Sequence, residues 1–270
     1  MSSPVRLAIA GAGGRMGHML LQASAQDKDT VIAAAFDVPG SPFIGNAVNA
    51  QVRISSDLDA GLADAEVFID FTRPVGTLAH LSKCVTHQVA MVIGTTGFDV
   101  AGKAAIAEAG KHIPIVFAPN MSVGVNTAFK LLELAAKALQ DGYDIEIVEM
   151  HHKHKVDAPS GTAVKMGEII AEAQGSTLAE RAVYSREGHT GARPDNAIGF
   201  ATLRGGDVVG DHTVVFASEG ERIEISHKSS SRVSYATGSM RAAHFLAKRL
   251  RAQQAGVYDM QDVLGLREQH

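Results

Sequence analysis

The chain has little of several features that mark particular classes of protein. Its one cysteine, Cys84, excludes an intrachain disulfide and favours a reducing, cytoplasmic compartment. No apolar run approaches the roughly 20 residues that span a bilayer, and the N-terminus lacks the apolar stretch of a signal peptide. The 25 basic and 29 acidic residues give a net charge of −4, which argues against a general nucleic-acid binder. We therefore expect a soluble protein with neither a membrane nor a nucleic acid as partner.

The first part of the 270-residue chain alternates short apolar runs with helical patterns. Runs so apolar are expected where helices cover both faces of a sheet, and the β-α-β repeat predicts a doubly wound parallel sheet. The predicted strands are Val5–Ala10, Thr30–Phe36, Val67–Asp70, Val89–Ile93 and Ile113–Phe117, and the helical stretches include Arg15–Ser24, Val75–His87 and Val100–Lys111.

The pattern changes after about residue 120. A helix is predicted over 123–139, with an apolar face formed by Leu131, Leu134, Ala135 and Ala138. Strand-like runs follow, and two of them are joined by the tight hairpin sequence Glu219-Gly220-Glu221. These predicted strands are Asp144–Met150, Ala197–Leu203, His212–Ser218 and Arg222–His227.

This second pattern predicts an α+β domain with an open mixed or antiparallel sheet. We expect residues 1–122 to form a dinucleotide-binding domain and residues 123–230 a domain for substrate binding and oligomerisation. A final helix, about 231–253, and a short tail to residue 270 belong either to the second domain or to the first, which would then be discontinuous.

A glycine-rich loop joins the first predicted strand to the first helix. It reads Gly11, Ala12, Gly13, Gly14, Arg15, Met16, Gly17, so the last glycine falls one position later than in the G-x-G-x-x-G fingerprint. Glycines here allow a tight turn and let backbone N–H groups approach a pyrophosphate at a helix N-terminus. An acid, Asp37, follows the second strand, where it can accept hydrogen bonds from ribose hydroxyls.

This context predicts a Rossmann domain that binds a dinucleotide. Because a carboxylate repels a 2′-phosphate, Asp37 favours NADH over NADPH. Further strand-end loops are candidates for cofactor contacts, namely Phe71–Pro74, Gly94-Thr95-Thr96-Gly97 and Ala118-Pro119-Asn120-Met121. The alternative is a glycine-rich turn in a flavodoxin-like sheet without a cofactor.

Histidine and lysine cluster in the segment from Glu149 to Thr162, which contains His151-His152-Lys153-His154-Lys155 and Pro159-Ser160-Gly161-Thr162. Ser160 is a plausible N-cap of a helix over 163–173, and a helix start beside cationic side chains favours carboxylate or phosphate binding. Histidine and lysine can also move protons. The segment is thus a candidate anion-binding and catalytic site.

Two other interpretations of the segment stay open. Imidazoles of His151, His152 and His154 suit a metal such as zinc, although their spacing converges poorly and the lysines repel a cation. The segment is also compatible with a solvated basic loop.

The segment from His151 to Thr162 resembles the signature of the dihydrodipicolinate reductase family, the 4-hydroxy-tetrahydrodipicolinate reductases of diaminopimelate and lysine biosynthesis. The resemblance extends along the chain in order, through Gly11–Gly17, Phe68–Pro74, Val92–Phe98, Val123–Asn126, Tyr184–Gly191 and His227–Arg232.

The resemblance implies NADH- or NADPH-dependent reduction of a cyclic hydroxy-dicarboxylate, with loss of water, by a homotetramer built through the second sheet. It implies that His151 is the acid/base residue and Lys155 the proton donor, and that His152 and Ser160–Thr162 contact substrate carboxylates. The resemblance also implies cofactor contacts from Gly94–Thr96 and Ala118–Met121.

The chain departs from this family after Asp37, where many members carry an arginine and this sequence has Val38. We therefore expect a preference for NADH, with NADPH as a second choice. Two other functions stay open. One is a Rossmann dehydrogenase acting on another small amino-acid-derived semialdehyde or carboxylate, and the other is a dinucleotide-binding sensor without catalysis.

Overall fold

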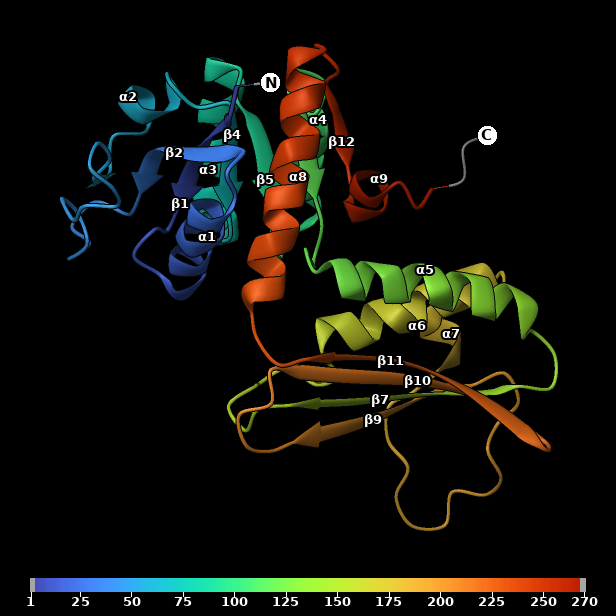
Figure 1. Cartoon of the computed structure of the whole chain (residues 1–270). Helices are drawn as coiled ribbons and strands as arrows, with labels where there is room; N and C mark the ends of the chain where they lie inside the picture. Colours follow the sequence, from blue (N-terminus) through green and yellow to red (C-terminus); the bar gives the residue numbers. More distant parts are fainter. Residues whose placement is uncertain (1–2, 268–270) are drawn as a thin grey trace. The chain divides into compact units, whose positions relative to one another are not determined.

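The computed structural model describes residues 3–267 and divides them into two compact units (Figure 1). One unit contains the chain up to Val123 and again from Val233 onward, and the other contains Gly124–Arg232. The first unit is therefore discontinuous, and the second is inserted into it.

The sheet of the first unit has seven strands, all parallel. They are β1 (Val5–Ala10), β2 (Thr30–Phe36), β3 (Ile54–Ser55), β4 (Val67–Asp70), β5 (Ala90–Ile93), β6 (Pro114–Phe117) and β12 (Gly256–Tyr258). Their order is β12-β6-β5-β4-β1-β2-β3. The chain therefore places β2 and β3 on one side of β1 and then β4, β5 and β6 on the other side, so the strand order reverses at β1. Ligands in open α/β sheets bind at the carboxyl ends of the strands at such a reversal.

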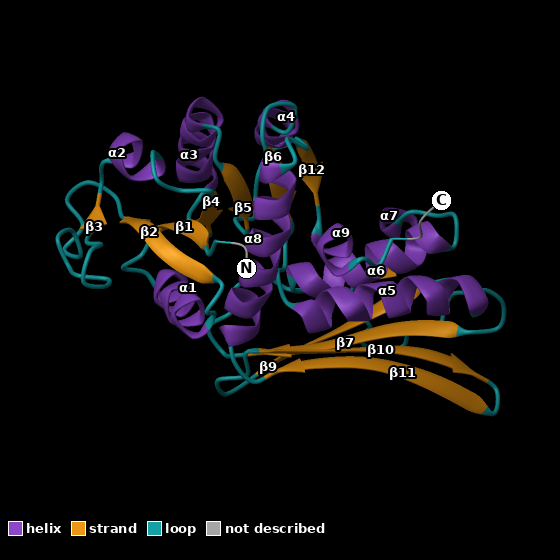
Figure 2. Ribbon diagram, turned by 45° about the horizontal axis from the view of Figure 1, so that its top comes forward, coloured by secondary structure: helices purple, strands orange, loops and turns teal. Residues whose placement is uncertain are grey.

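Helices cover both faces of this sheet (Figure 2). They are α1 (Arg15–Gln26), α2 (Leu58–Leu62), α3 (Pro74–His87), α4 (Val100–Ala109), α8 (Val233–Arg251) and α9 (Met260–Leu264). Leu20 of α1 and Leu246 of α8 pack on one face, while Leu81 of α3 and Ile106 of α4 pack on the other. The predicted doubly wound parallel sheet is confirmed.

The C-terminal tail differs from the prediction. After α8 the chain adds β12 to the edge of the first sheet, next to β6, and then forms α9 with a capping box at Asp259. Met260 is fully buried in the core shared with α8. The tail was missed because a three-residue strand carries no measurable periodicity.

The second unit contains a five-stranded sheet of order β11-β10-β7-β9-β8. Its strands are β7 (Asp144–His151), β8 (Ala182–Val183), β9 (Ile198–Arg204), β10 (Gly210–Ser218) and β11 (Glu221–Ser229). β10 pairs antiparallel with β7 and β11, whereas β9 pairs parallel with β7 and β8. The predicted mixed sheet is confirmed, and the predicted hairpin turns at Gly220, whose φ is +93°.

The helices of the second unit are α5 (Val123–Ala138), α6 (Gly161–Ala173) and α7 (Leu178–Arg181). The α5 side chains that enter the core are Val125, Ala128, Phe129, Leu132 and Ala136. The predicted apolar face is largely wrong, because Leu131 and Leu134 are about half exposed, at 49% and 48%, and Ala138 is exposed, whereas only Ala135 packs against the core. The leucine-rich stripe and the buried stripe lie on different sides of the same helix.

Within residues 3–267, no helix combines the length and the apolar character needed to cross a membrane.

Candidate active site

The glycine loop closes tightly between β1 and α1. Gly11 has φ +61°, and its carbonyl accepts a hydrogen bond from the Gly14 N–H at 2.9 Å. Gly14 is the N-cap of α1, which begins at Arg15 and continues with Met16. A Cβ on Gly17 would lie 2.2 Å from the Gly11 carbonyl oxygen. Gly17 therefore allows the close approach of helix and loop that the fingerprint assigns to its last glycine.

Asp37 lies against this loop. It follows β2 directly, and its Oδ2 accepts a hydrogen bond from the Gly13 N–H at 3.2 Å, while its Oδ1 accepts one from Val38 N–H at 2.8 Å. Ala12 is anchored to the same strand, because its N–H donates to the Phe36 carbonyl at 2.9 Å. The acid thus stands at the glycine loop, as a ribose-binding carboxylate must.

The other predicted cofactor loops lie at neighbouring strand ends. Gly94, the buried Thr95 and the exposed Thr96 follow β5, whereas Ala118, Pro119, Asn120 and Met121 follow β6. Ala118 N–H donates to the Ile93 carbonyl at 3.3 Å, and Asn120 Oδ1 accepts from Ser122 N–H at 2.9 Å. Since β6, β5, β4, β1 and β2 are consecutive neighbours, the predicted cofactor residues gather at one edge of the sheet.

These residues fit a dinucleotide. The left-handed Gly11 and the close-packed Gly17 leave backbone at the start of a helix, where a pyrophosphate binds, and Asp37 supplies a carboxylate for ribose hydroxyls.

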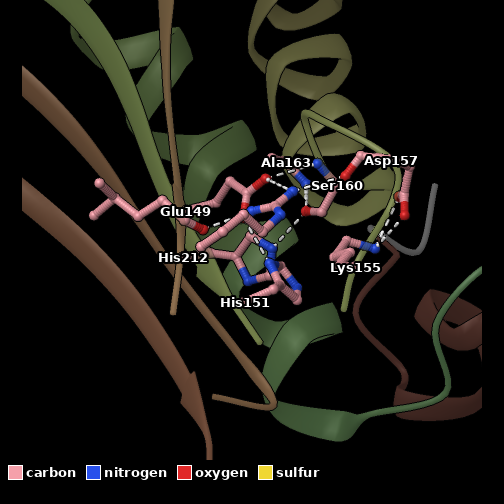
Figure 3. A network of polar contacts seen from close by, with 9 residues as sticks. Glu149, His151, Lys155, Asp157, Ser160, Ala163 and His212 are labelled. Carbon is pink, nitrogen blue, oxygen red and sulfur yellow. Dashed lines mark hydrogen bonds and ion pairs between the residues drawn. The ribbon is translucent and has the colours of Figure 1, made fainter. Parts of the chain in front are cut away.

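In the second unit, Glu149 and His151 lie side by side at the end of β7. Alternate residues of this strand are buried, so both side chains point to the helix-covered face. Oε2 of Glu149 lies 2.6 Å from Nδ1 of His151 (Figure 3). Since a carboxylate only accepts, we assign the proton of this bond to Nδ1, which leaves Nε2 as the basic nitrogen of the neutral ring.

Glu149 is 1% exposed and accepts four hydrogen bonds. The Arg204 guanidinium donates to both oxygens at 2.8 and 3.0 Å, and Ser160 N–H donates to Oε1 at 2.9 Å, in addition to His151. Burial raises the pKa of Glu149, but Arg204, His151 and Ser160 outweigh it, and the net pKa is lowered. The carboxylate is therefore charged and fixed in orientation.

Ser160 caps α6 as predicted: its Oγ accepts from Ala163 N–H at 3.1 Å. The same Oγ lies 2.8 Å from Nε2 of His212, which comes from β10 (Figure 3). Gly161 and Thr162 are the first two residues of α6 and lie at the positive end of its dipole. Burial, then the neighbouring His151, lower the pKa of His212 to about 4, so His212 is neutral near pH 7.

The remaining predicted residues form a cationic loop after β7. Lys155 Nζ is paired with Asp157 at 2.8 Å, and the Lys155 N–H donates to the His152 carbonyl at 3.1 Å. Partial desolvation, then the charges of Arg232 and His154, lower the pKa of His152. The loop thus places a lysine that is paired with Asp157, and a histidine with a lowered pKa, directly after His151.

Sequence reasoning missed the residues that hold these groups. Arg204 fixes both Glu149 and the loop, since it also donates to the Asp157 carbonyl at 2.7 Å. A Cβ on Gly210 would lie 3.0 Å from Nε2 of His151. The i, i+2 spacing of Glu149 and His151 on a strand could have revealed their pairing, but Arg204, Gly210 and His212 become neighbours only through the sheet register.

Among residues 3–267, no group of three histidine, cysteine, aspartate or glutamate side chains is arranged to hold a metal ion.

The structure combines a Rossmann sheet that carries a dinucleotide-type glycine loop with a second sheet that carries a buried carboxylate–histidine pair beside a helix N-terminus. This combination is typical of two-domain oxidoreductases. Comparisons make this assignment more specific. The model of the dihydrodipicolinate reductase N-terminus matches residues 5–121, and that of the C-terminus matches residues 124–264. The chain therefore belongs to the dihydrodipicolinate reductase family.

Individual relatives agree over nearly the whole chain. The 4-hydroxy-tetrahydrodipicolinate reductases of Janthinobacterium sp. (strain Marseille) and Cupriavidus pinatubonensis (strain JMP 134 / LMG 1197) are 60% and 62% identical. Each alignment covers 97% of this chain and 99% or 100% of the relative.

The dipicolinate-bound dihydrodipicolinate reductase from Paenisporosarcina sp. TG-14 shares the fold. Its TM-score is 0.77 at 24% identity, over 96% of this chain and 98% of the other.

Proposed function

We propose that this protein reduces 4-hydroxy-tetrahydrodipicolinate to tetrahydrodipicolinate, with loss of water, in lysine and diaminopimelate biosynthesis. The observation that carries the proposal is identity of about 60% over nearly the full length to reductases with this name. The carboxylate–histidine pair beside the start of α6 is the chemistry that an anionic substrate and a proton transfer require.

The second unit supplies the substrate-binding residues. A dicarboxylate pairs with the positive end of α6 at Gly161 and Thr162, with Ser160 holding the first turn in place. His152 contributes a ring donor from the adjacent loop. The dipicolinate-bound relative from Paenisporosarcina sp. TG-14 supports a small dicarboxylate as the substrate class.

His151 and Lys155 handle protons. Glu149 fixes the His151 ring with Nδ1 protonated, so Nε2 can accept or return a proton. Lys155 Nζ lies 2.8 Å from Asp157 and donates a proton to the substrate that has received the hydride. Replacing either residue should lower kcat strongly and leave dinucleotide binding nearly intact, whereas full activity in either variant would contradict its role.

The first unit supplies the cofactor-binding residues. A reduced nicotinamide dinucleotide, when bound, supplies the hydride. The glycine loop Gly11–Met16 would hold its pyrophosphate, Asp37 its adenosine ribose, and the loops Gly94–Thr96 and Ala118–Met121 the remainder.

NADH is the preferred cofactor in this proposal. The Asp37 carboxylate is fixed at the glycine loop, and Val38, which is 67% exposed, gives no charge to a 2′-phosphate. Measuring kcat/KM for NADH and NADPH tests this, and a strong preference for NADPH would overturn it.

The central experiment is an assay of NADH oxidation that is started by the product of dihydrodipicolinate synthase. We expect oxidation only when that product is present. Binding of NADH without turnover of this or another small acid would instead favour a sensor, and turnover of a different semialdehyde would favour a different dehydrogenase.

The second sheet is also the proposed assembly surface of a cytoplasmic homotetramer. The helices of its unit lie on one face, and Leu203 of β9, which is 50% exposed, lies beside Met150 on the other face. Sedimentation equilibrium tests this assembly, and a monomer at micromolar concentration would exclude it.

A further inference from the structure

We infer that buried Asp70 and its partner His80 position the loops that bind the dinucleotide. The pair lies in the first unit, outside the proton-transfer site. The inference rests on the proposed function, since it concerns how that unit holds its cofactor.

Asp70 is the last residue of β4 and is fully buried. Its Oδ1 accepts the N–H and the hydroxyl of Thr72, both at 2.7 Å, and the Thr95 hydroxyl at 3.4 Å. Thr77 of α3 donates in turn to Thr95 at 2.8 Å. One carboxylate oxygen thus joins the loop after β4 to the loop after β5.

His80 of α3 occupies the other oxygen. Its Nδ1 lies 2.6 Å from Asp70 Oδ2, and its ring packs on Phe68 with centroids 5.3 Å apart. A buried carboxylate must be compensated by donors, so Nδ1 carries a proton in this bond. His80 therefore fixes the direction in which Asp70 presents Oδ1 to Thr72.

Thr72 lies where three strand-end loops meet. A Cβ on Gly11 would lie 3.3 Å from Thr72 Cγ2, so Thr72 lines the glycine loop after β1. The adjacent Phe71 ring lies on Gly94, where an added Cβ would come within 2.1 Å of it. Moving Thr72 would displace the residues at Gly11 and Gly94 that are proposed to hold the cofactor.

A buried carboxylate is a weak source of stability compared with an apolar side chain of the same volume, but the hydrogen bonds that it accepts fix geometry closely. Asp70 is placed to fix geometry, because its hydrogen bonds reach loops at the edge of the sheet where the cofactor is proposed to bind. His80 acts through Asp70 and Thr72, and is a positioning residue.

The test is NADH binding, measured by the change in NADH fluorescence, in three single variants of the full chain. His80→Ala should raise the Kd for NADH on the order of tenfold, the value of one hydrogen bond to a charged group. His80→Asn, whose amide nitrogen can replace Nδ1, should restore the Kd to within about threefold. His87→Ala is the matched control, because His87 lies on the same helix and pairs with exposed Asp59 at 2.8 Å.

Two further readouts separate positioning from general loss of structure. His80→Ala should raise KM for NADH while leaving kcat and the Kd for dipicolinate unchanged. Thr72→Val should raise the Kd for NADH as well. The double variant His80→Ala/Thr72→Val should have a Kd no higher than that of the weaker-binding single variant, because the effects of coupled residues are not additive.

The inference is overturned if His80→Ala binds NADH like the wild type, if it loses dipicolinate affinity equally, or if the effects of His80→Ala and Thr72→Val multiply. A wild-type protein that binds dipicolinate but not NADH would overturn the proposed function, and this inference with it.

Discussion

Nδ1 of His151 lies 2.6 Å from Oε2 of Glu149 because the two residues are two positions apart on β7 and point to the same face. The carboxylate can only accept, so it selects the ring tautomer in which Nε2 is basic. Glu149 itself is held by Arg204 and by the backbone of Ser160. The orientation of the imidazole is therefore set by three separate segments of the chain.

Replacing Glu149 by Gln should lower kcat on the order of 100-fold, as expected for loss of correct acid/base function. The amide can donate to Nδ1, which would move the ring proton to Nε2. Steady-state kinetics check this, with KM for NADH expected to stay constant. Glu146→Gln is the control, since Glu146 lies on the same strand and pairs with Arg186 and Arg193. Equal loss in both variants would show a general effect on folding.

Gly210→Ala should impair the site sterically. The new Cβ would press on Nε2 of His151 from 3.0 Å, so the ring must shift. We expect kcat to fall at least about tenfold, since a misplacement of about 1 Å can cost about 100-fold. Gly205→Ala, which would meet only the Met150 methyl at 3.2 Å, should keep most activity. Equal kcat values for the two variants would contradict this account.

Stability should fall as the pH drops from 6.5 toward 4, partly because of His212. Its pKa is lowered to about 4 in the folded chain by burial and by His151, whereas the unfolded value is near 6.5. The unfolded state then binds more protons in this window, so unfolding becomes easier as pH falls, by roughly 3 kcal/mol in total.

Urea unfolding at several pH values measures this. The slope of unfolding free energy against pH reports how many more protons the unfolded state binds than the folded state. In His212→Gln this number should decrease by up to about one between pH 4 and 6.5. His189→Gln, in an exposed loop, should leave the slope as in the wild type. An unchanged slope in His212→Gln would show that this histidine is not the titrating group.

Val38→Arg should widen cofactor use. The position is exposed and directly follows Asp37, so a guanidinium there can pair with a 2′-phosphate. We expect kcat/KM for NADPH to rise about tenfold, the value of one charge-assisted hydrogen bond, with little change for NADH. Val38→Gln is the uncharged control, and an equal gain in both variants would exclude a charge effect.

Much of the fold could be predicted from the sequence because the strands of the first sheet are short, almost uninterrupted apolar runs between helical patterns. β1, β2 and β4 begin and end at the predicted residues. α5 shows the limit of this approach: periodicity selected the stripe with Leu131 and Leu134, yet the sheet packs against the stripe with Phe129 and Leu132. Only tertiary contacts decide between two apolar stripes on one helix.

The site was predicted only where it is local in sequence. The segment from His151 to Thr162 is continuous, and the N-cap role of Ser160 is confirmed. Arg204 lies 55 positions from Glu149, and His212 lies 52 positions from Ser160. Their proximity depends on the pairing of β9 and β10 with β7, which one sequence does not specify.

The discontinuity of the first unit has a consequence for synthesis on the ribosome. The unit's sheet lacks its edge strand β12, and the apolar face that α8 covers stays open, until the chain beyond Val233 has been translated. Gly124–Arg232 is complete earlier, so the inserted unit is expected to fold while the surrounding one is still unfinished. Protease digestion of ribosome-bound chains, stalled when residue 232 has just left the exit tunnel, would test this order. Protection of the inserted segment alone is expected, and early protection of residues 5–117 would refute it.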